Sequence, residues 1–263
     1  MSIVYQNNVV VGTTQIGKIK PDANGYYEVV LGAFNINNSG GAYYPLEPVK
    51  DLLLSSSNLM RRIKDRALRS EYGHPRKGAM RPAEFLARVM DILEENTCNH
   101  IMKIELDEKR VVDPTTNKTA AVIMGWVYPS GPRGPVLEKQ FSNPHESVSY
   151  SIRSITNDHF DATGTLIKEI KEIVTWDYVN EPGIHLAKKG FSPSLESHAQ
   201  TYSDIDYCVF DERTILEARE LVKESGVGNE STQAMFDILL RHGVVDTPYG
   251  KMYRARPSAA WRR

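Results

Sequence analysis

Hydrophobic and polar residues follow two periods over the N-terminal part of the chain, one typical of strands and one typical of helices. Runs rich in β-branched and aromatic residues, bounded by Asn, Gly or Pro, predict strands. They cover residues 9–12, 26–34, 100–112, 120–128, 147–153 and 167–179. Apolar residues at helical spacing, basic runs and a Pro at a first helical position predict helices. They cover residues 58–70, 83–95 and 136–141.

One predicted strand has two different faces. Residues 148–153 read Val-Ser-Tyr-Ser-Ile-Arg, and successive side chains of a strand point to opposite sides of its sheet. The apolar side predicts contact with a core, and the polar side is typical of the solvated face of an antiparallel sheet. Ser149, Ser151 and Arg153 share the polar side.

The pattern changes after the last of these strands. Residues 190–203 are rich in Ser, Pro, Gln and His, which is typical of a linker. Helical patterns then return over residues 211–224 and 231–243, the first opening on an Asp that can act as N-cap. We therefore predict a β-rich domain over residues 1–185, and a linker, a small helical segment and a basic tail over residues 186–263.

Composition indicates a soluble globular protein without a nucleic-acid partner. The 263 residues are 41% hydrophobic and 25% charged, with a net charge of −1, whereas electrostatic duplex binding usually needs a basic excess. The exception is a basic tail, which we interpret as a solvated end rather than a handle for an acidic scaffold or for packaged nucleic acid. This tail contains Arg254, Arg256, Arg262 and Arg263. No long apolar run and no signal-peptide pattern are present, so we expect no membrane span and a cytosolic protein.

Neither a metal nor a nucleotide site is expected. Cys98 and Cys208 stand far apart without neighbours at zinc spacing, so we predict two reduced, buried thiols. Residues 12–18 match the glycine and lysine spacing of a phosphate-binding loop. However, Ile19 replaces the Ser or Thr that would hold magnesium, and Pro21 opposes the helix that must follow. A hairpin turn explains this segment better.

His74 and a strand serine could together carry out serine hydrolysis. This chemistry needs a hydroxyl, a neutral imidazole to take its proton, and a group that orients the imidazole. Pro75 biases His74 towards an extended backbone, and Gly73 permits a close approach before it. A serine on a strand has a fixed direction. A histidine before proline is also common in turns, so this pattern alone leaves the function open.

Three short motifs in a fixed order add a resemblance. Residues 71–75 read Glu-Tyr-Gly-His-Pro, residues 151–153 read Ser-Ile-Arg, and residues 175–183 read Thr-Trp-Asp-Tyr-Val-Asn-Glu-Pro-Gly. In this order they resemble the signature of the prohead, or capsid maturation, serine proteases of tailed bacteriophages. Those enzymes resemble the herpesvirus assemblins in fold. The resemblance covers about residues 1–185.

The resemblance implies an α+β fold. We expect an antiparallel β-barrel of the assemblin and prohead-protease type, closed or nearly closed and surrounded by helices, with the C-terminal helical segment added to it. The helices at residues 58–70 and 83–95 would cover the outside of the barrel. His74 would then come from the segment between them.

The resemblance also implies roles for the motif residues. His74 is the general base and Ser151 the nucleophile, because the family pattern places Ser two residues before Arg. Ser149 is the weaker alternative, since both serines share one strand face. Arg153 is expected to help stabilise the oxyanion.

The third member of the active site is an acid or a second histidine in the related families. Asp177 is our choice, from the third motif. Glu71 is the runner-up, and its ordinary interpretation is a surface carboxylate paired with a neighbouring arginine. His159 and His185 are weaker candidates.

The expected function is that of a serine endopeptidase of prohead maturation. Its substrates would be scaffold and major capsid proteins, cut inside the prohead in the cytoplasm of the infected bacterial host, without a cofactor. Family members often cut after Glu that follows a small or aliphatic residue. Residues 194–196 read Ser-Leu-Glu, which predicts self-processing after Glu196. The sequence does not define the oligomeric state and leaves room for a homo-oligomer.

Two other classes of protein remain open from the sequence. The first is a catalytically inactive prohead core or scaffold protein built on the same barrel, against which the retained His74 and Ser151 argue. The second is a nucleotide-dependent assembly factor that would use residues 12–18.

Overall fold

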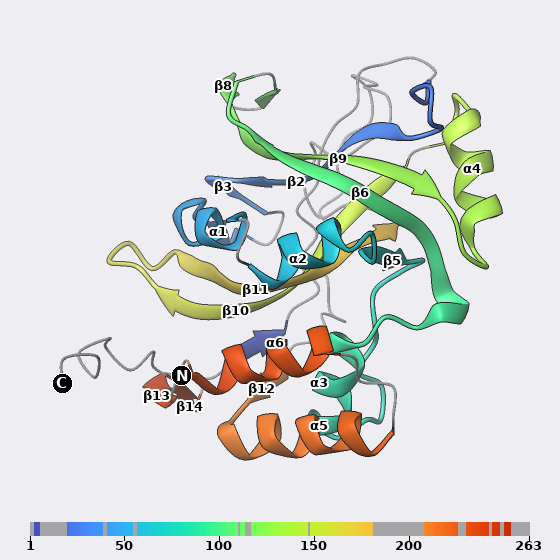
Figure 1. The fold of residues 1–263 in the computed structure, drawn as a ribbon. Helices are drawn as coiled ribbons and strands as arrows, with labels where there is room; N and C mark the ends of the chain where they lie inside the picture. The colour runs from blue at the N-terminus through green and yellow to red at the C-terminus, as the bar shows by residue number, and fades with distance from the viewer. Residues whose placement is uncertain are drawn as a thin grey trace.

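Strands form two main sheets in the computed structural model, and helices lie against them, which confirms the α+β class (Figure 1). The structure describes residues 3–5, 20–38, 41–54, 57–109, 111–113, 117–146, 148–180, 208–225, 230–241, 244–247 and 250–253. The predicted strand at residues 9–12, the phosphate-loop-like segment, the linker and the basic tail lie outside these residues.

The first sheet is built around one long antiparallel hairpin. Its strand order is β12-β1-β10-β11-β4-β3. These strands are β12 (Cys208–Phe210), β1 (Ile3–Tyr5), β10 (Ser149–Phe160), β11 (Leu166–Val179), β4 (Tyr43–Tyr44) and β3 (Ile36–Asn37). β10 and β11 pair along their whole length, with register shifts after Arg153 and Ile155. This hairpin confirms the two last predicted strands of the N-terminal part.

The second sheet is wholly antiparallel, with the order β2-β9-β6-β5. Its strands are β2 (Tyr27–Phe34), β9 (Ala121–Pro129), β6 (Thr97–Asp107) and β5 (Arg69–Glu71). Two short hairpins stand apart from both sheets. They are β7 (Val112–Asp113) with β8 (Lys118–Thr119), and β13 (Val244–Thr247) with β14 (Gly250–Tyr253).

The two sheets meet at the end of β5. Tyr72 forms a parallel bridge with Tyr178 of β11, and the Gly73 N–H donates to the Tyr178 carbonyl over 2.7 Å. The Thr175 hydroxyl donates to the Arg69 carbonyl over 2.6 Å. On the other side, β2 lies against β10. The two sheets together form one curled, mainly antiparallel layer, which we call the wall. The expected closed or nearly closed antiparallel barrel is present only as this curled half-barrel, with a parallel bridge at Tyr72 and the parallel pair β4–β11.

Helices cover the wall, but two of them are shorter than predicted. They are α1 (Glu47–Leu52), α2 (Asn58–Lys64), α3 (Pro82–Met90), the 3₁₀ turn η1 (Glu94–Asn96) and α4 (Gly134–Ser142). The helix predicted for residues 58–70 stops at Lys64, because Arg66 adopts a φ of 58° and the chain then enters β5. The helix predicted for residues 83–95 stops at Met90, because Asp91 is extended.

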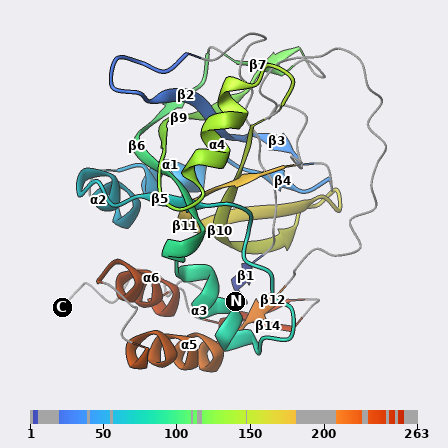
Figure 2. The same ribbon diagram turned by 90° about the vertical axis from the view of Figure 1, so that its right-hand side faces the viewer.

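A second apolar core joins the C-terminal helices to α3 (Figures 1 and 2). The predicted helices are confirmed as α5 (Glu212–Glu224), whose N-cap Asp211 accepts the Thr214 N–H, and α6 (Glu230–Arg241). The first core fills the wall itself. The second contains side chains of α3, β12, α5 and α6, among them Phe85, Phe210, Ile215 and Phe236. The division at residue 185 stays a prediction, and α3 packs with the segment beyond it.

Candidate active site

The β10–β11 hairpin places a serine and an aspartate opposite each other. Ser151 pairs with Asp177 in the antiparallel register, so both side chains lie on one face of the sheet. Arg153, two residues further along β10, lies on the same face. Ser149, Ser151 and Arg153 are all buried. The expectation that this polar face is solvated was therefore wrong, because other polar groups pack against it.

His74 reaches this face from the segment that follows the parallel bridge between the sheets. Gly73 has a φ of 86°, a left-handed conformation that suits glycine, and its N–H is fixed to β11. The His74 Nδ1 lies 2.8 Å from Asp177 Oδ2, and its Nε2 contacts Ser151 Oγ. Because Nδ1 keeps its proton and donates a hydrogen bond to the Asp177 carboxylate, Nε2 has a free lone pair and can accept the Ser151 hydroxyl proton. We call Ser151, His74 and Asp177 the triad.

Ser149 shares the strand face of Ser151 but not its position. It pairs with Val179 at the end of β11, which lies two residues beyond Asp177 on the same face of the sheet. The imidazole of His74 contacts the hydroxyl of Ser151. The geometry therefore favours Ser151, a choice that strand parity could not make.

Asp177 accepts hydrogen bonds on both carboxylate oxygens. Oδ1 accepts from the Glu71 N–H at 3.0 Å and from Arg153 Nη2 at 2.8 Å, and Oδ2 accepts from Arg153 Nε at 2.7 Å and from His74. Burial alone would raise the pKa of Asp177, but the Arg153 charge and the His74 ring lower it to about 2. Asp177 is therefore ionised at neutral pH and can hold the imidazole ring.

The guanidinium of Arg153 has all of its donors engaged inside the protein. Nε and Nη2 hold Asp177, Nη2 also lies 3.0 Å from Glu71 Oε1, and Nη1 donates to the carbonyls of Asp91 at 2.8 Å and Val89 at 3.4 Å. An arginine has five N–H groups, and these contacts use them. The guanidinium is thus directed at Asp177 and Glu71, and the oxyanion role expected for Arg153 stays a prediction.

Glu71 is a buried carboxylate and not the surface group that its ordinary interpretation predicted. Its oxygens accept from Arg88, from the Leu93 N–H and from the Asn96 side chain. Burial raises the pKa of Glu71, but Arg153 and Arg88 lower this pKa by a larger amount, so that the net shift is downward. Its side chain points into this network, and Asp177 is the acid that contacts His74.

Both cysteines are free and buried, as the sequence predicted. Burial raises the pKa of the Cys98 thiol to about 12, which leaves it uncharged at neutral pH. The thiolate is the nucleophilic form of cysteine, so Cys98 is not a competitor of Ser151.

Two classes of feature are missing from the part of the chain that the structure describes. No group of three or more His, Cys, Asp or Glu side chains there is arranged to hold a metal ion. None of the helices described has the length and apolar character that a membrane span needs.

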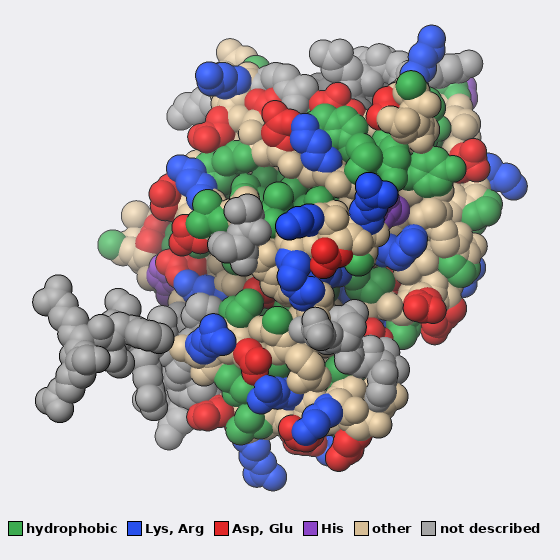
Figure 3. Space-filling model, viewed as in Figure 1, with side chains coloured by type: hydrophobic (Ala, Val, Ile, Leu, Met, Phe, Trp, Pro, Cys, Tyr) green, Lys and Arg blue, Asp and Glu red, His purple; other side chains and the backbone are tan. Residues whose placement is uncertain are grey.

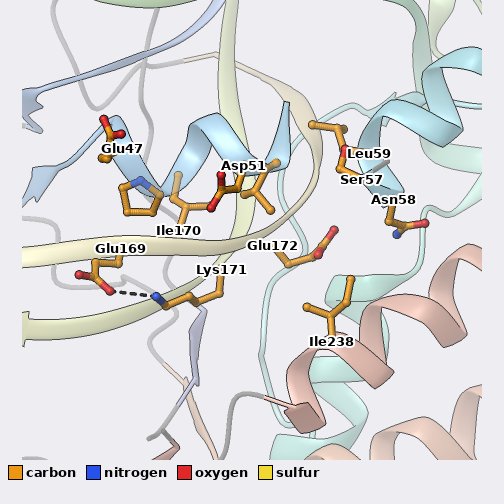
Figure 4. Close-up of a pocket in the computed structure, with 12 residues that line it drawn as sticks. Glu47, Asp51, Ser57, Asn58, Leu59, Glu169, Ile170, Lys171, Glu172 and Ile238 are labelled. Carbon is orange, nitrogen blue, oxygen red and sulfur yellow. Dashed lines mark hydrogen bonds and ion pairs between the residues drawn. The ribbon is translucent and has the colours of Figure 1, made fainter. Parts of the chain in front are cut away.

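A hollow of about 620 Å³ lies away from the triad, between α1, α2, β11 and α6 (Figure 4). Its lining mixes apolar side chains with Glu47, Asp51, Glu169 and Glu172. Burial raises the pKa of Glu172 to about 7, although the Arg62 charge and Asn58 act in the opposite direction. The face that contains α1 and α2 carries interspersed acidic and basic side chains (Figure 3).

A family profile and a phage relative agree with the motif resemblance. The profile of the Peptidase S80 family matches residues 5–239. The capsid maturation protease of Pseudomonas phage phiKZ is 37% identical over 203 residues, which cover 74% of this chain and 72% of that protein. Among solved structures, the capsid assembly protease of bacteriophage T4 matches with a TM-score of 0.41 and 11% identity, over 73% of this chain and 98% of that one.

Proposed function

Since the chain belongs to the peptidase S80 family, we propose that it is a serine endopeptidase whose nucleophile is Ser151, whose general base is His74 and whose orienting acid is Asp177. The observation that carries this proposal is the position of the His74 ring. One ring nitrogen contacts the Asp177 carboxylate and the other the Ser151 hydroxyl, which is the arrangement that serine hydrolysis needs.

The reaction would proceed by acyl transfer in two halves. Ser151 Oγ attacks the carbonyl carbon of the scissile peptide, and its proton passes to His74 Nε2. His74 then donates this proton to the leaving amine as the C–N bond breaks, which leaves an ester on Ser151. Water, deprotonated by His74, attacks the ester; the bond from the acyl carbon to Oγ breaks, His74 returns the proton to Ser151 Oγ, and the carboxylic acid is released. Asp177 stays ionised and stabilises the imidazolium in both halves, and Arg153 supports Asp177.

The substrates of this reaction are proposed from the phage relative, which is named for capsid maturation. We propose that this chain cuts capsid and scaffold proteins within an assembling prohead in the infected cell. The family preference implied by the sequence motifs adds cleavage after Glu.

Self-processing after Glu196 is a finer part of the same proposal. Glu196 follows Ser194 and Leu195 and lies outside the described residues, between β11 and β12. Polar segments between packed elements are preferred sites of proteolytic cutting.

One mass-spectrometry experiment tests both parts of the proposal. Wild-type chain and Ser151→Ala are each incubated with the major capsid and scaffold proteins of the same phage, and intact masses are followed over time. We expect fragments ending in Glu with the wild type alone, and a chain fragment ending at Glu196. Intact substrates with folded wild-type protein would favour the inactive core protein. Cutting of substrates by a chain that keeps its full mass would remove only the self-processing proposal.

A further inference from the structure

We propose that Glu71 is a positioning residue through which the C-terminal helices α5 and α6 hold Asp177 in place. This inference rests on the proposed function, because it concerns the acid of the same active site. The connection consists of three contacts in series: the C-terminal helices on α3, α3 on Glu71 and Arg153, and Arg153 on Asp177.

The first contact is the apolar core between α3 and the C-terminal helices. Phe85 of α3 lies 6.4 Å from Phe210 of β12, measured between ring centroids, and both rings are buried. Buried side chains of α5 and α6 complete this core. At the start of α3, Arg81 forms an ion pair of 2.9 Å with Glu217 of α5. Since α3 has most of its apolar face in this core, α5 and α6 fix its position.

The second contact runs from the last turn of α3 to the charged network. Arg88 donates from Nη1 to Glu71 Oε1 over 2.9 Å and from Nη2 to Oε2. The carbonyls of Val89 and Asp91, at the end of the helix, accept from Arg153. Carbonyls at a helix end lack intrahelical partners and carry partial negative charge, so a guanidinium suits this position.

The third contact is an alternating series of charges, in which Arg88 is partly exposed and Glu71, Arg153 and Asp177 are buried. Arg88, Glu71, Arg153 and Asp177 alternate in sign, and each makes direct contact with the next. Glu71 also donates its backbone N–H to Asp177 over 3.0 Å. A buried charge that loses its partner is strongly disfavoured, so a shift of α3 would be passed on to Arg153 and hence to Asp177.

This arrangement changes what a cut between β11 and β12 would do. The C-terminal helices would stay bound through the second core after the chain is cut, since side chains of α3 pack there against those of β12, α5 and α6. The helices then act as a support of the active site and not as a removable inhibitor. A nicked enzyme that keeps them should remain active.

A double-mutant cycle between Phe210→Ala and Glu71→Gln tests the coupling. The readout is the rate at which a fluorophosphonate labels Ser151: a bond forms from Oγ to phosphorus, fluoride leaves and the proton passes to His74. We expect each single variant to lose roughly tenfold to 100-fold in rate, because small misplacements of catalytic groups are costly. If Phe210 acts through Glu71, the double variant loses no more than the worse single variant.

Controls separate positioning from a general loss of stability. Phe34→Ala removes a buried ring from the first core. It should lower the melting temperature about as much as Phe210→Ala yet label at the wild-type rate. Arg88→Lys, which keeps the charge, should recover part of the rate that Arg88→Ala loses. If Phe210→Ala does not fold, Phe210→Leu replaces it in the cycle.

The outcomes are distinguishable from a failure of the proposed function. Wild-type protein that is not labelled at Ser151 would overturn the proposed function itself. Two results with labelled wild type would overturn only the coupling through Glu71 and leave the proposed function standing. They are rate losses that multiply in the double variant, and a rate loss in Phe34→Ala equal to that in Phe210→Ala.

Discussion

Among the groups around Asp177, the Arg153 guanidinium lowers the pKa of its carboxyl the most. Burial opposes the ionised form, and the Arg153 guanidinium is the largest of the groups that restore it. With a pKa of about 2, below the ordinary value of 3.8, Asp177 contributes stability that is present above the ordinary value. That contribution is lost only as the pH falls through about 2.

The first prediction concerns Arg153→Met. Without the guanidinium, burial dominates and the pKa of Asp177 rises above its ordinary value. Protonated Asp177 holds the His74 ring poorly, so labelling of Ser151 should fall at least about tenfold at pH 6 and recover as the pH rises. The measurement is the labelling rate against pH, with thermal melts at each pH. A profile parallel to that of the wild type, from folded protein, would contradict this account of Asp177.

At the level of elements, the sequence predicted most strands and the helices of the C-terminal segment. Both strands of the β10–β11 hairpin were predicted, from alternating polar and apolar residues and from β-branched runs. The ends of α2 and α3 were not predicted, because they depend on single backbone conformations at Arg66 and Asp91. Helix propensity near both residues is ordinary, and tertiary contacts decide where the chain turns.

The site was predictable only as far as its motifs extend. His74, Ser151 and Asp177 lie in the three quoted motifs, and the structure brings their side chains together. Arg88 and Asn96, which hold Glu71, were not identified. Arg88 looks like any polar residue on the outer face of an amphipathic helix, and only the position of β5 shows that it faces a buried carboxylate.

The second prediction concerns Glu172 on β11. Its pKa of about 7, against an ordinary 4.5, means that its contribution to stability is full below the ordinary value and is lost as the pH rises through about 7. Glu172→Gln should therefore raise the free energy of unfolding at pH 8 by about 3 kcal/mol relative to its effect at pH 4.5, at roughly 1.4 kcal/mol for each pKa unit.

The measurement is denaturant unfolding of wild type and Glu172→Gln at both pH values. Glu169→Gln, on the same strand and paired with Lys171, is the matched control and should show no such gain at pH 8. Labelling of Ser151 should not change in either variant, because neither residue contacts the triad. A Glu172→Gln effect that is independent of pH would show that the carboxyl is not buried in its neutral form.

At the scale of the whole molecule, one helix connects the second core to the charged network on the wall: the buried apolar side chains of α3 belong to the second core, and Arg88 contacts Glu71. α3 lies between the curled wall and α5, and α6 lies beside α3, against α2 and β11 (Figures 1 and 2). The sequence suggested an independent barrel followed by an appendage, since residues 190–203 have the composition of a linker. Local composition cannot reveal that Phe85 and its neighbours on α3 meet apolar side chains more than a hundred residues further along the chain. The match of the family profile through residue 239 includes these helices.

The central claim is that Ser151 is the nucleophile activated by His74. The most direct measurement is fluorophosphonate labelling of the full chain, followed by fragmentation of the labelled peptide, for wild type, Ser149→Ala, Ser151→Ala and His74→Ala. We predict label on Ser151 in wild type and in Ser149→Ala, none in Ser151→Ala, and almost none in His74→Ala. Label on Ser149, or label that persists in folded Ser151→Ala, would contradict the account.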